Sequence, residues 1–143
     1  GLLNQNSYLN RTAQMRQGGV LVVFDVDNFK QINDRYGHLQ GDACLAGIAA
    51  CIKKAYAPYG FCYRVGGDEF CVLLKDGQQE AACAREFLRR LAQMRQELPL
   101  LPMVSFGSAP FTGEDIARVK EQADQQMYRY KKAHRDGAAP SSQ

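Results

Sequence analysis

Two apolar runs around a pair of glycines constrain the fold of this chain more than any other feature. The stretch reads FCYRVGGDEFCVLL and covers residues 61–74. Apolar runs joined by a glycine turn are typical of a β-hairpin, so adjacent antiparallel strands are expected at 61–65 and 70–74. The hairpin makes part of the sheet antiparallel and argues against a doubly wound parallel fold. The turn needs its glycines, but it does not need the two carboxylates that follow, Asp68 and Glu69.

Hydrophobic periodicity predicts the other elements. Buried strands are expected at 20–26 and 103–109. Helices are expected at 2–16, at 28–35, after Gly41, at 78–96, and after Thr112, which would cap the last one. Gly37 is expected to end the second helix in a left-handed conformation. A mostly antiparallel central sheet flanked by helices places the chain in the α+β class.

Composition restricts the classes of protein to which this chain can belong. The 143 residues, 45% of them hydrophobic, suit one globular domain at 1–136, followed by a tail at 137–143 that is expected to be disordered. The net charge of +3 is small and spread along the chain, so nucleic-acid binding is not expected. No apolar run reaches about 18 residues, so the domain is expected to make no membrane contact.

Cysteine usage predicts the compartment. The five cysteines form no C-x-x-C pair, and a disulfide framework is not expected in a chain of this size. They are interpreted as free thiols that act as small hydrophobic residues in a reducing compartment, the cytoplasm: Cys44, Cys51, Cys62, Cys71 and Cys83.

Three or four acidic side chains would meet at one edge of the sheet if the predicted hairpin packs beside the first strand. Asp25 and Asp27 end the first strand two residues apart, so their side chains point to the same face. If the hairpin packs beside that strand, Asp68 and Glu69 join them. Like charges about 4 Å apart repel by about 4 kcal/mol at an effective dielectric constant near 20, so such a cluster needs a cation. Oxygen ligands select a hard cation such as Mg²⁺, which also binds substrate phosphates, so we expect a nucleotide-phosphate site.

The acidic signals also have structural interpretations when each is taken alone. Asp68 and Glu69 suit a solvated turn, and Asp27 or Asn28 suits a helix N-cap. The N-cap and the phosphate site are compatible, because a helix N-terminus binds anions through its free backbone N–H groups. Here those groups would belong to Asn28, Phe29 and Lys30.

The last predicted helix carries two basic residues near its end. Lys131 and Arg135 stand at i and i+4, so they share one face of the helix. Such a pair commonly compensates the helix dipole, and it would equally well bind phosphate oxygens. Taken singly, none of these signals decides the function.

In combination, these segments resemble the GGDEF family, the catalytic domains of diguanylate cyclases. The resemblance rests on RVGGDEF at 64–70, preceded by FDVDNFKQINDRYGHLQGD at 24–42. It continues through VSFG at 104–107 and ADQQMYRYKKAHR at 123–135, and so covers nearly the whole chain. It implies a fold similar to the polymerase palm and to nucleotide cyclases. It also implies an enzyme that joins two GTP molecules into cyclic di-GMP and releases two pyrophosphates.

The resemblance implies roles for individual residues. The catalytic residues would be Asp25, Asp68 and Glu69, with Glu69 also helping to deprotonate the attacking hydroxyl. These three and the Val26 carbonyl would bind Mg²⁺ or Mn²⁺. The nucleotide would contact Asn33 and Asp42 at the guanine edge, Leu45 in the base pocket, Asn28, Phe29, Lys30, Gly66 and Gly67 along the backbone, and Lys131 and Arg135 at the β- and γ-phosphates. Arg64 would brace the turn from behind.

The resemblance also implies partners and competing functions. One domain would hold one GTP, so catalysis would need a homodimer. An N-terminal sensory or dimerisation region is expected in a longer parent chain, with or without a membrane anchor. The alternative is a GTP-binding regulatory module with little turnover that acts through partner contacts. A third function, a cyclic di-GMP receptor, is disfavoured because Ala57, Pro58, Tyr59 and Gly60 stand where the family's inhibitory site has R-x-x-D.

Overall fold

The computed structural model describes residues 19–111 and 115–135, the last two by their backbone alone. The helix predicted at 2–16, the Thr112 cap and the tail at 137–143 therefore lie outside the described residues. Within these ranges the order is β1 (Gly19–Val26), α2 (Phe29–Tyr36), α3 (His38–Tyr56), η1 (Ala57–Tyr59), β2 (Gly60–Arg64), β3 (Glu69–Leu74), η2 (Gly77–Gln79), α4 (Glu80–Glu97), β4 (Val104–Phe111) and α5 (Ile116–Arg135).

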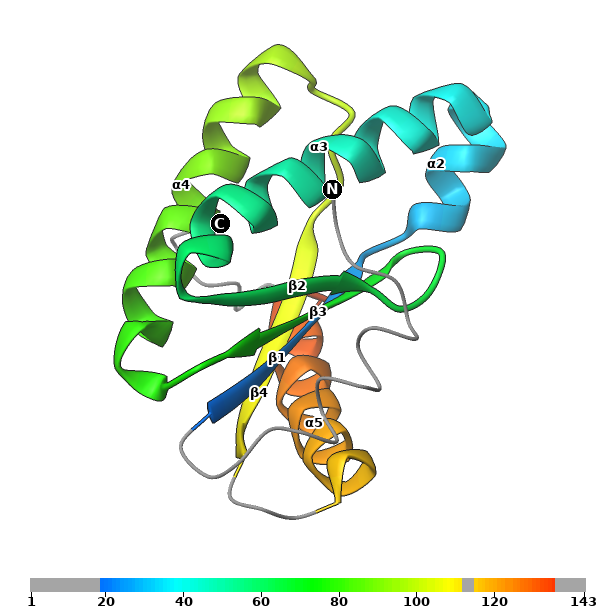
Figure 1. Cartoon of the computed structure of the whole chain (residues 1–143). Coiled ribbons are helices and arrows are strands. Elements are labelled where there is room, and N and C mark those ends of the chain that lie inside the picture. The colour runs from blue at the N-terminus through cyan, green and yellow to red at the C-terminus, as the bar shows by residue number, and fades with distance from the viewer. Residues whose placement is uncertain (1–18, 112–114, 136–143) are drawn as a thin grey trace.

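The four described strands form one sheet in the order β2-β3-β1-β4. Every neighbouring pair is antiparallel, which confirms the predicted α+β class with an antiparallel sheet. Figure 1 shows α3 and α4 on one face of the sheet and α5 on the other. The central position of β1 follows from its sequence, because a strand covered on both faces needs apolar residues at nearly every position.

The core has two parts, one on each face of the sheet. Alternate side chains of β1, such as Val22 and Phe24, pack with the inner faces of α3 and α4. The intervening side chains, Leu21 and Val23, pack with α5. A period of two along β1 therefore supplies both layers, and it also decides toward which helix the polar end of the strand points.

The junction between α2 and α3 differs from the prediction in two respects. Gly37 ends α2 with a positive φ of 88°, but its ψ of 162° lies outside the left-handed helical conformation that was expected. In addition, α3 already begins at His38 and contains Gly41. The Gly37 N–H donates to the Asn33 carbonyl (2.8 Å), and the Gly37 carbonyl accepts from the Gly41 N–H (3.1 Å). Because Gly37 closes one helix and opens the next, the long helix needs no break at Gly41.

The last helix lies unusually close to the sheet at Gly107. A β-carbon at this position would lie 2.3 Å from the Met127 nitrogen and 2.6 Å from the Ala123 carbonyl oxygen. Only glycine permits this approach, because the contacting atoms are backbone atoms that cannot rotate away. The close approach fixes α5, and thus its side chains, relative to β1.

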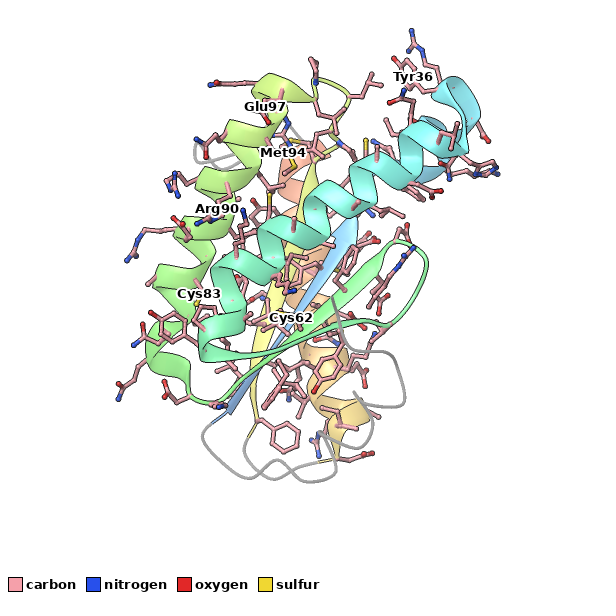
Figure 2. The ribbon with its side chains drawn as sticks, turned by 45° about the horizontal axis from the view of Figure 1, so that its top comes forward. Tyr36, Cys62, Cys83, Arg90, Met94 and Glu97 are labelled. Atoms are coloured by element: carbon pink, nitrogen blue, oxygen red, sulfur yellow. The ribbon has the colours of Figure 1, made fainter. Side chains whose placement is uncertain are left out.

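The five cysteines are buried and unpaired, as predicted. Burial raises the pKa of the Cys62 and Cys71 thiols to about 12. Figure 2 labels Cys62 on β2 and Cys83 on α4, both in the layer between the sheet and its helices. None of the helices that the structure describes has both the length and the apolar character needed to span a bilayer.

Candidate active site

The hairpin packs directly beside β1 and brings the two acidic segments together. Asp25 is the cross-strand partner of Glu69 in the ladder between β1 and β3. The Val26 N–H donates to the Asp68 carbonyl at 3.2 Å. Opposed residues of an antiparallel pair project to the same face, so the Asp25 and Glu69 side chains both lie on the α5 side. The adjacency expected from the sequence is therefore present.

Asp27 has a different environment from the other carboxylates. Both of its carboxylate oxygens accept from the Ser105 hydroxyl at 2.9 Å, and the residue is 7% exposed. The position before α2 belongs instead to Asn28, which has φ 56° and makes no side-chain cap hydrogen bond. Of the two predicted N-cap residues, Asn28 therefore occupies the N-cap position without a side-chain cap hydrogen bond. Asp27 is not the N-cap, because its carboxylate accepts from Ser105 of β4.

Two lysines of α5 pair with the carboxylates. Lys131 Nζ lies 3.1 Å from an Asp25 oxygen and 3.7 Å from an Asp27 oxygen. Lys120 Nζ lies 3.2 Å from Glu69 and 3.1 Å from Asp124. The carboxylates on the α5 side of the sheet are thus matched by ammonium groups of the last helix.

The same contacts perturb both lysines. Partial burial lowers the pKa of the Lys131 ammonium, but its hydrogen bond and the charges of Asp25 and Asp27 outweigh burial, so the pKa is raised. At Lys120 burial again lowers the pKa, and the Asp124 hydrogen bond and the Glu69 charge again raise it above the usual value. Both groups are therefore fully charged near neutral pH.

Sequence reasoning found Lys131 but missed Lys120 and Ser105. A usable signal exists for Lys120, because it precedes Lys131 by eleven residues, about three helical turns, and so lies on the same face. For Ser105, the alternation within VSFG predicts the face of the sheet to which its side chain points, but it does not identify Asp27 as the hydrogen-bond partner. The second predicted phosphate ligand, Arg135, is the last residue of α5, and its side chain lies outside the described part of the chain.

The carboxylates suit a hard cation whose remaining coordination positions are filled by other ligands. In the part of the chain that the structure describes, no three His, Cys, Asp or Glu side chains converge closely enough to hold a metal by themselves. Mg²⁺ commonly uses one or two carboxylates together with water and substrate phosphates. The cross-strand pair of Asp25 and Glu69, with Asp68 beside it, fits that all-oxygen pattern.

Arg64 supports the turn of the hairpin. Its Nε donates to the Gly66 carbonyl at 3.2 Å and a terminal nitrogen donates to the Gly67 carbonyl at 2.6 Å. These contacts match the bracing role expected for Arg64. A β-carbon at Gly67 would meet nothing within 4 Å, so a contact within the described chain does not explain that glycine. Close approach of a nucleotide to the turn stays a prediction.

The residues expected to contact the base lie on α2 and α3. Asn33 is half-buried, and its Oδ1 is buried without a hydrogen-bond partner among the described residues. Asp42 is exposed on α3. Leu45 is 4% exposed and packs in the core, so the structure gives it a packing role and its contact with a base stays a prediction.

The start of α2 is the expected phosphate-binding backbone. The helix begins at Phe29, directly after the β1 carboxylates, so its first N–H groups lie at the same edge of the sheet. Asn28 and Lys30 are exposed, while Phe29 packs partly against the core. Phosphate binding by these N–H groups stays a prediction.

A hollow of about 650 Å³ adjoins the carboxylates along α5. Its described lining includes Asp25, Asp124, Met127, Tyr128 and Lys131. Ligand pockets commonly have volumes of about 300–1,000 Å³, so this space is large enough for a nucleotide. Fold and site together define an antiparallel α+β domain with an acidic, lysine-paired site beside this hollow.

Comparison with known proteins places the chain in a family. The profile of the diguanylate cyclase GGDEF domain matches residues 3–137. The chain belongs to this GGDEF family.

Relatives at the level of sequence support the same assignment. The chain is 40% identical over 131 residues to the diguanylate cyclase DgcP of Pseudomonas aeruginosa, covering 85% of the chain and 19% of that protein. It is 31% identical over 131 residues to a diguanylate cyclase of Vibrio cholerae, covering 88% of the chain and 41% of that protein. The chain thus spans less than half of the length of these relatives.

Solved structures show the same fold. The diguanylate cyclase SiaD of Pseudomonas aeruginosa, crystallised with its activator SiaC, superposes with a TM-score of 0.81 at 27% identity over 92% of this chain and 56% of that one. The active GGEEF domain of a Vibrio cholerae diguanylate cyclase gives a TM-score of 0.71 at 30% identity over 88% of this chain and 84% of that one.

Proposed function

We propose that this domain is a diguanylate cyclase that joins two GTP molecules into cyclic di-GMP and releases two pyrophosphates. The observation that carries the proposal is the register that sets Asp25 opposite Glu69, because it unites the two acidic motifs at one edge of the sheet. The relatives that are diguanylate cyclases, at 31% and 40% identity, support it.

The chemistry requires a metal and a set of residues around it. A bound Mg²⁺ or Mn²⁺ would lower the pKa of the ribose 3′-hydroxyl and stabilise charge on the α-phosphate and the leaving pyrophosphate. Asp25, Asp68, Glu69 and the Val26 carbonyl would hold the ion. The 3′-oxygen bonds to the α-phosphorus of the other GTP, the bond from that phosphorus to the pyrophosphate oxygen breaks, and Glu69 accepts the hydroxyl proton.

Basic and backbone groups would bind the triphosphate. Lys131 pairs with Asp25 at 3.1 Å, so its ammonium lies beside the proposed metal ligand and is placed to exchange the carboxylate for phosphate oxygens. The first N–H groups of α2 lie at the same edge and would bind further oxygens. Arg135 would assist from the end of α5.

A single domain would bind one GTP, so the reaction needs two domains facing each other. Each supplies one attacking hydroxyl and one attacked phosphate, which makes catalysis mainly a matter of positioning. We therefore propose a homodimer as the active form, brought together by a further region of a longer parent chain.

The test is a product assay on the domain fused to a dimerising coiled coil. With GTP and Mg²⁺ we expect cyclic di-GMP and pyrophosphate by chromatography, and we expect Asp25→Asn to abolish both. Asp34→Asn is the matched control, because Asp34 is exposed on the neighbouring α2 and takes no part in the proposed site. Product no greater than the Asp25→Asn background would refute the cyclase. Tight GTP binding without pyrophosphate release would instead support the regulatory module.

A further inference from the structure

We propose that Gly41 positions the Asn33 side chain, and that position 41 is thereby a determinant of base specificity. The proposal rests on the proposed guanine-nucleotide site. Gly41 itself would touch no part of the ligand, because its effect passes through Asn33. Because Gly41 has no β-carbon, the Asn33 side-chain carbonyl can pack against it. This packing determines which end of the Asn33 amide faces outward.

The two residues occupy the same small space. A β-carbon at Gly41 would lie 1.8 Å from Asn33 Oδ1 and 3.0 Å from Asn33 Cγ. It would also lie 3.3 Å from a ring carbon of Phe29, on the same face of α2. Carbon and oxygen atoms that are not bonded cannot approach so closely. The side-chain carbonyl of Asn33 therefore fills the space that a β-carbon at position 41 would need.

The backbone holds the two residues in this register. The Gly37 N–H donates to the Asn33 carbonyl at 2.8 Å, and the Gly41 N–H donates to the Gly37 carbonyl at 3.1 Å. Gly37 has φ 88°, a conformation that glycine adopts without strain. The three residues, four apart in sequence, therefore lock the end of α2 onto the start of α3, and the contact between Asn33 and Gly41 is part of that junction.

Asn33 is poorly suited to a purely structural role. Its Oδ1 is buried and has no hydrogen-bond partner among the described residues, which is an unfavourable arrangement for a carbonyl oxygen. Gly41 is buried as well, and its α-carbon is not a hydrogen-bond donor for the Asn33 side-chain oxygen. Because the carbonyl end is the buried one, the amide nitrogen is the end that a ligand can reach, and it acts only as a donor.

The pair formed by Asn33 and Asp42 then presents a defined pattern to a base. Asn33 offers an N–H donor, and the exposed carboxylate of Asp42 offers acceptors. Guanine carries acceptors at O6 and N7 and donors at N1 and at its exocyclic amine, so both residues find partners. Adenine has an acceptor at N1, which the Asp42 carboxylate would repel. Rotation of the Asn33 amide would remove the donor and leave only the Asp42 half of this recognition.

The test measures three nucleotides rather than one. We would determine by calorimetry the Kd of the α,β-methylene triphosphates of guanosine, inosine and adenosine, which cannot react at the bond that breaks. Gly41→Ala forces the Asn33 side chain out of the space beside the Gly41 α-carbon. We expect guanosine and inosine analogues, which share O6 and N7, to lose affinity in parallel by about ten-fold, while the adenosine analogue changes little.

Gly47→Ala is the matched control on the same helix. A β-carbon at Gly47 would approach the Met94 thioether at 2.5 Å, but this is the end of a flexible side chain that can rotate aside. Figure 2 shows Met94 on α4, well away from Tyr36 at the end of α2. We expect Gly47→Ala to leave all three affinities unchanged.

A double variant separates positioning from general damage. In an Asn33→Ala background no side-chain carbonyl occupies the space beside Gly41. Adding Gly41→Ala should therefore cause no loss of guanosine affinity beyond that of Asn33→Ala alone. If Gly41→Ala alone does not fold, recovery of the folded circular dichroism spectrum by the double variant would support the contact, and failure to recover would overturn it.

Three outcomes separate failure of the proposed function from failure of this inference. Wild-type protein that binds no guanosine analogue would refute the proposed function, and the inference with it. Wild-type protein that prefers guanosine to adenosine, together with a folded Gly41→Ala variant of unchanged preference, would overturn the inference alone. Equal loss for all three nucleotides would also overturn it, because that result indicates general distortion.

Discussion

Replacing Gly107 by alanine should force α5 away from the sheet. The new β-carbon would lie 2.3 Å from the Met127 nitrogen, 2.6 Å from the Ala123 oxygen and 2.9 Å from the Gln126 carbonyl carbon. These are backbone atoms of one helix, so α5 or β4 must move by roughly 1 Å to restore ordinary contact. Overpacking of this kind destabilises by about 1–3 kcal/mol. We expect the upper end of that range, because α5 also covers the buried Val119 and its cluster.

Urea unfolding followed by far-ultraviolet circular dichroism measures this effect. Small domains lose about 1–3 kcal/mol per molar urea, so a loss of about 3 kcal/mol lowers the midpoint by about 1–3 M. Gly77→Ala is the control, because its β-carbon would meet only a Val20 methyl group at 3.2 Å. A Gly107→Ala midpoint equal to that of the wild type would mean that α5 does not lie against β4 as described.

Three further perturbations have calculable directions. Lys120→Met should raise the affinity for Mn²⁺ about five-fold by calorimetry, because an ammonium 3.2 Å from Glu69 opposes a second cation; equal or weaker affinity would contradict this. Asn28→Val should lower the free energy of unfolding by about 1–2 kcal/mol, since φ is 56°, whereas Asn28→Gly should not; equal urea midpoints for the two variants would refute the assigned conformation. Burial in the folded protein raises the pKa of the Cys62 and Cys71 thiols from an ordinary value of 9.0 to about 12, so the stability they contribute is complete below about pH 9 and is lost as the pH rises toward 12. Urea midpoints at pH 8, 9 and 10 check this, and midpoints that do not fall above pH 9 would show that these thiols are accessible.

The sheet could be predicted because its sequence signals are local. The glycine turn gave the hairpin, and alternation within β1 gave the shared face of Asp25 and Asp27, which both contact Lys131. The register of Asp25 opposite Glu69 could not be read from the chain, because it depends on how the hairpin packs against β1. In the sequence, the packing of the hairpin beside β1 is only a condition on which the acidic cluster depends.

The errors and omissions arose where long-range contacts decide the outcome. Gly41 reads as a helix breaker by local preference, but the Gly37 hydrogen bonds continue the backbone into α3 without interruption. Asp27 suits an N-cap, yet its carboxylate accepts at 2.9 Å from the hydroxyl of Ser105, which lies on the neighbouring strand β4 but 78 residues later in the sequence. Lys120 became relevant only through the rotation of α5 about its axis, which packing at Gly107 sets.

The pairing of β1 with β3 has a consequence for how such a domain tolerates changes in length. Along β3, the hydrophobic and acidic side chains follow the same alternation between the two faces of the sheet. Deleting a single amino acid between Phe70 and Leu74 would therefore move every side chain on one side of the deletion to the opposite face. Glu69 could then stay beside Asp25 only if the apolar residues turned outward. Surface loops tolerate changes in length, whereas the register of these two strands cannot shift by a single residue without exposing the apolar side chains.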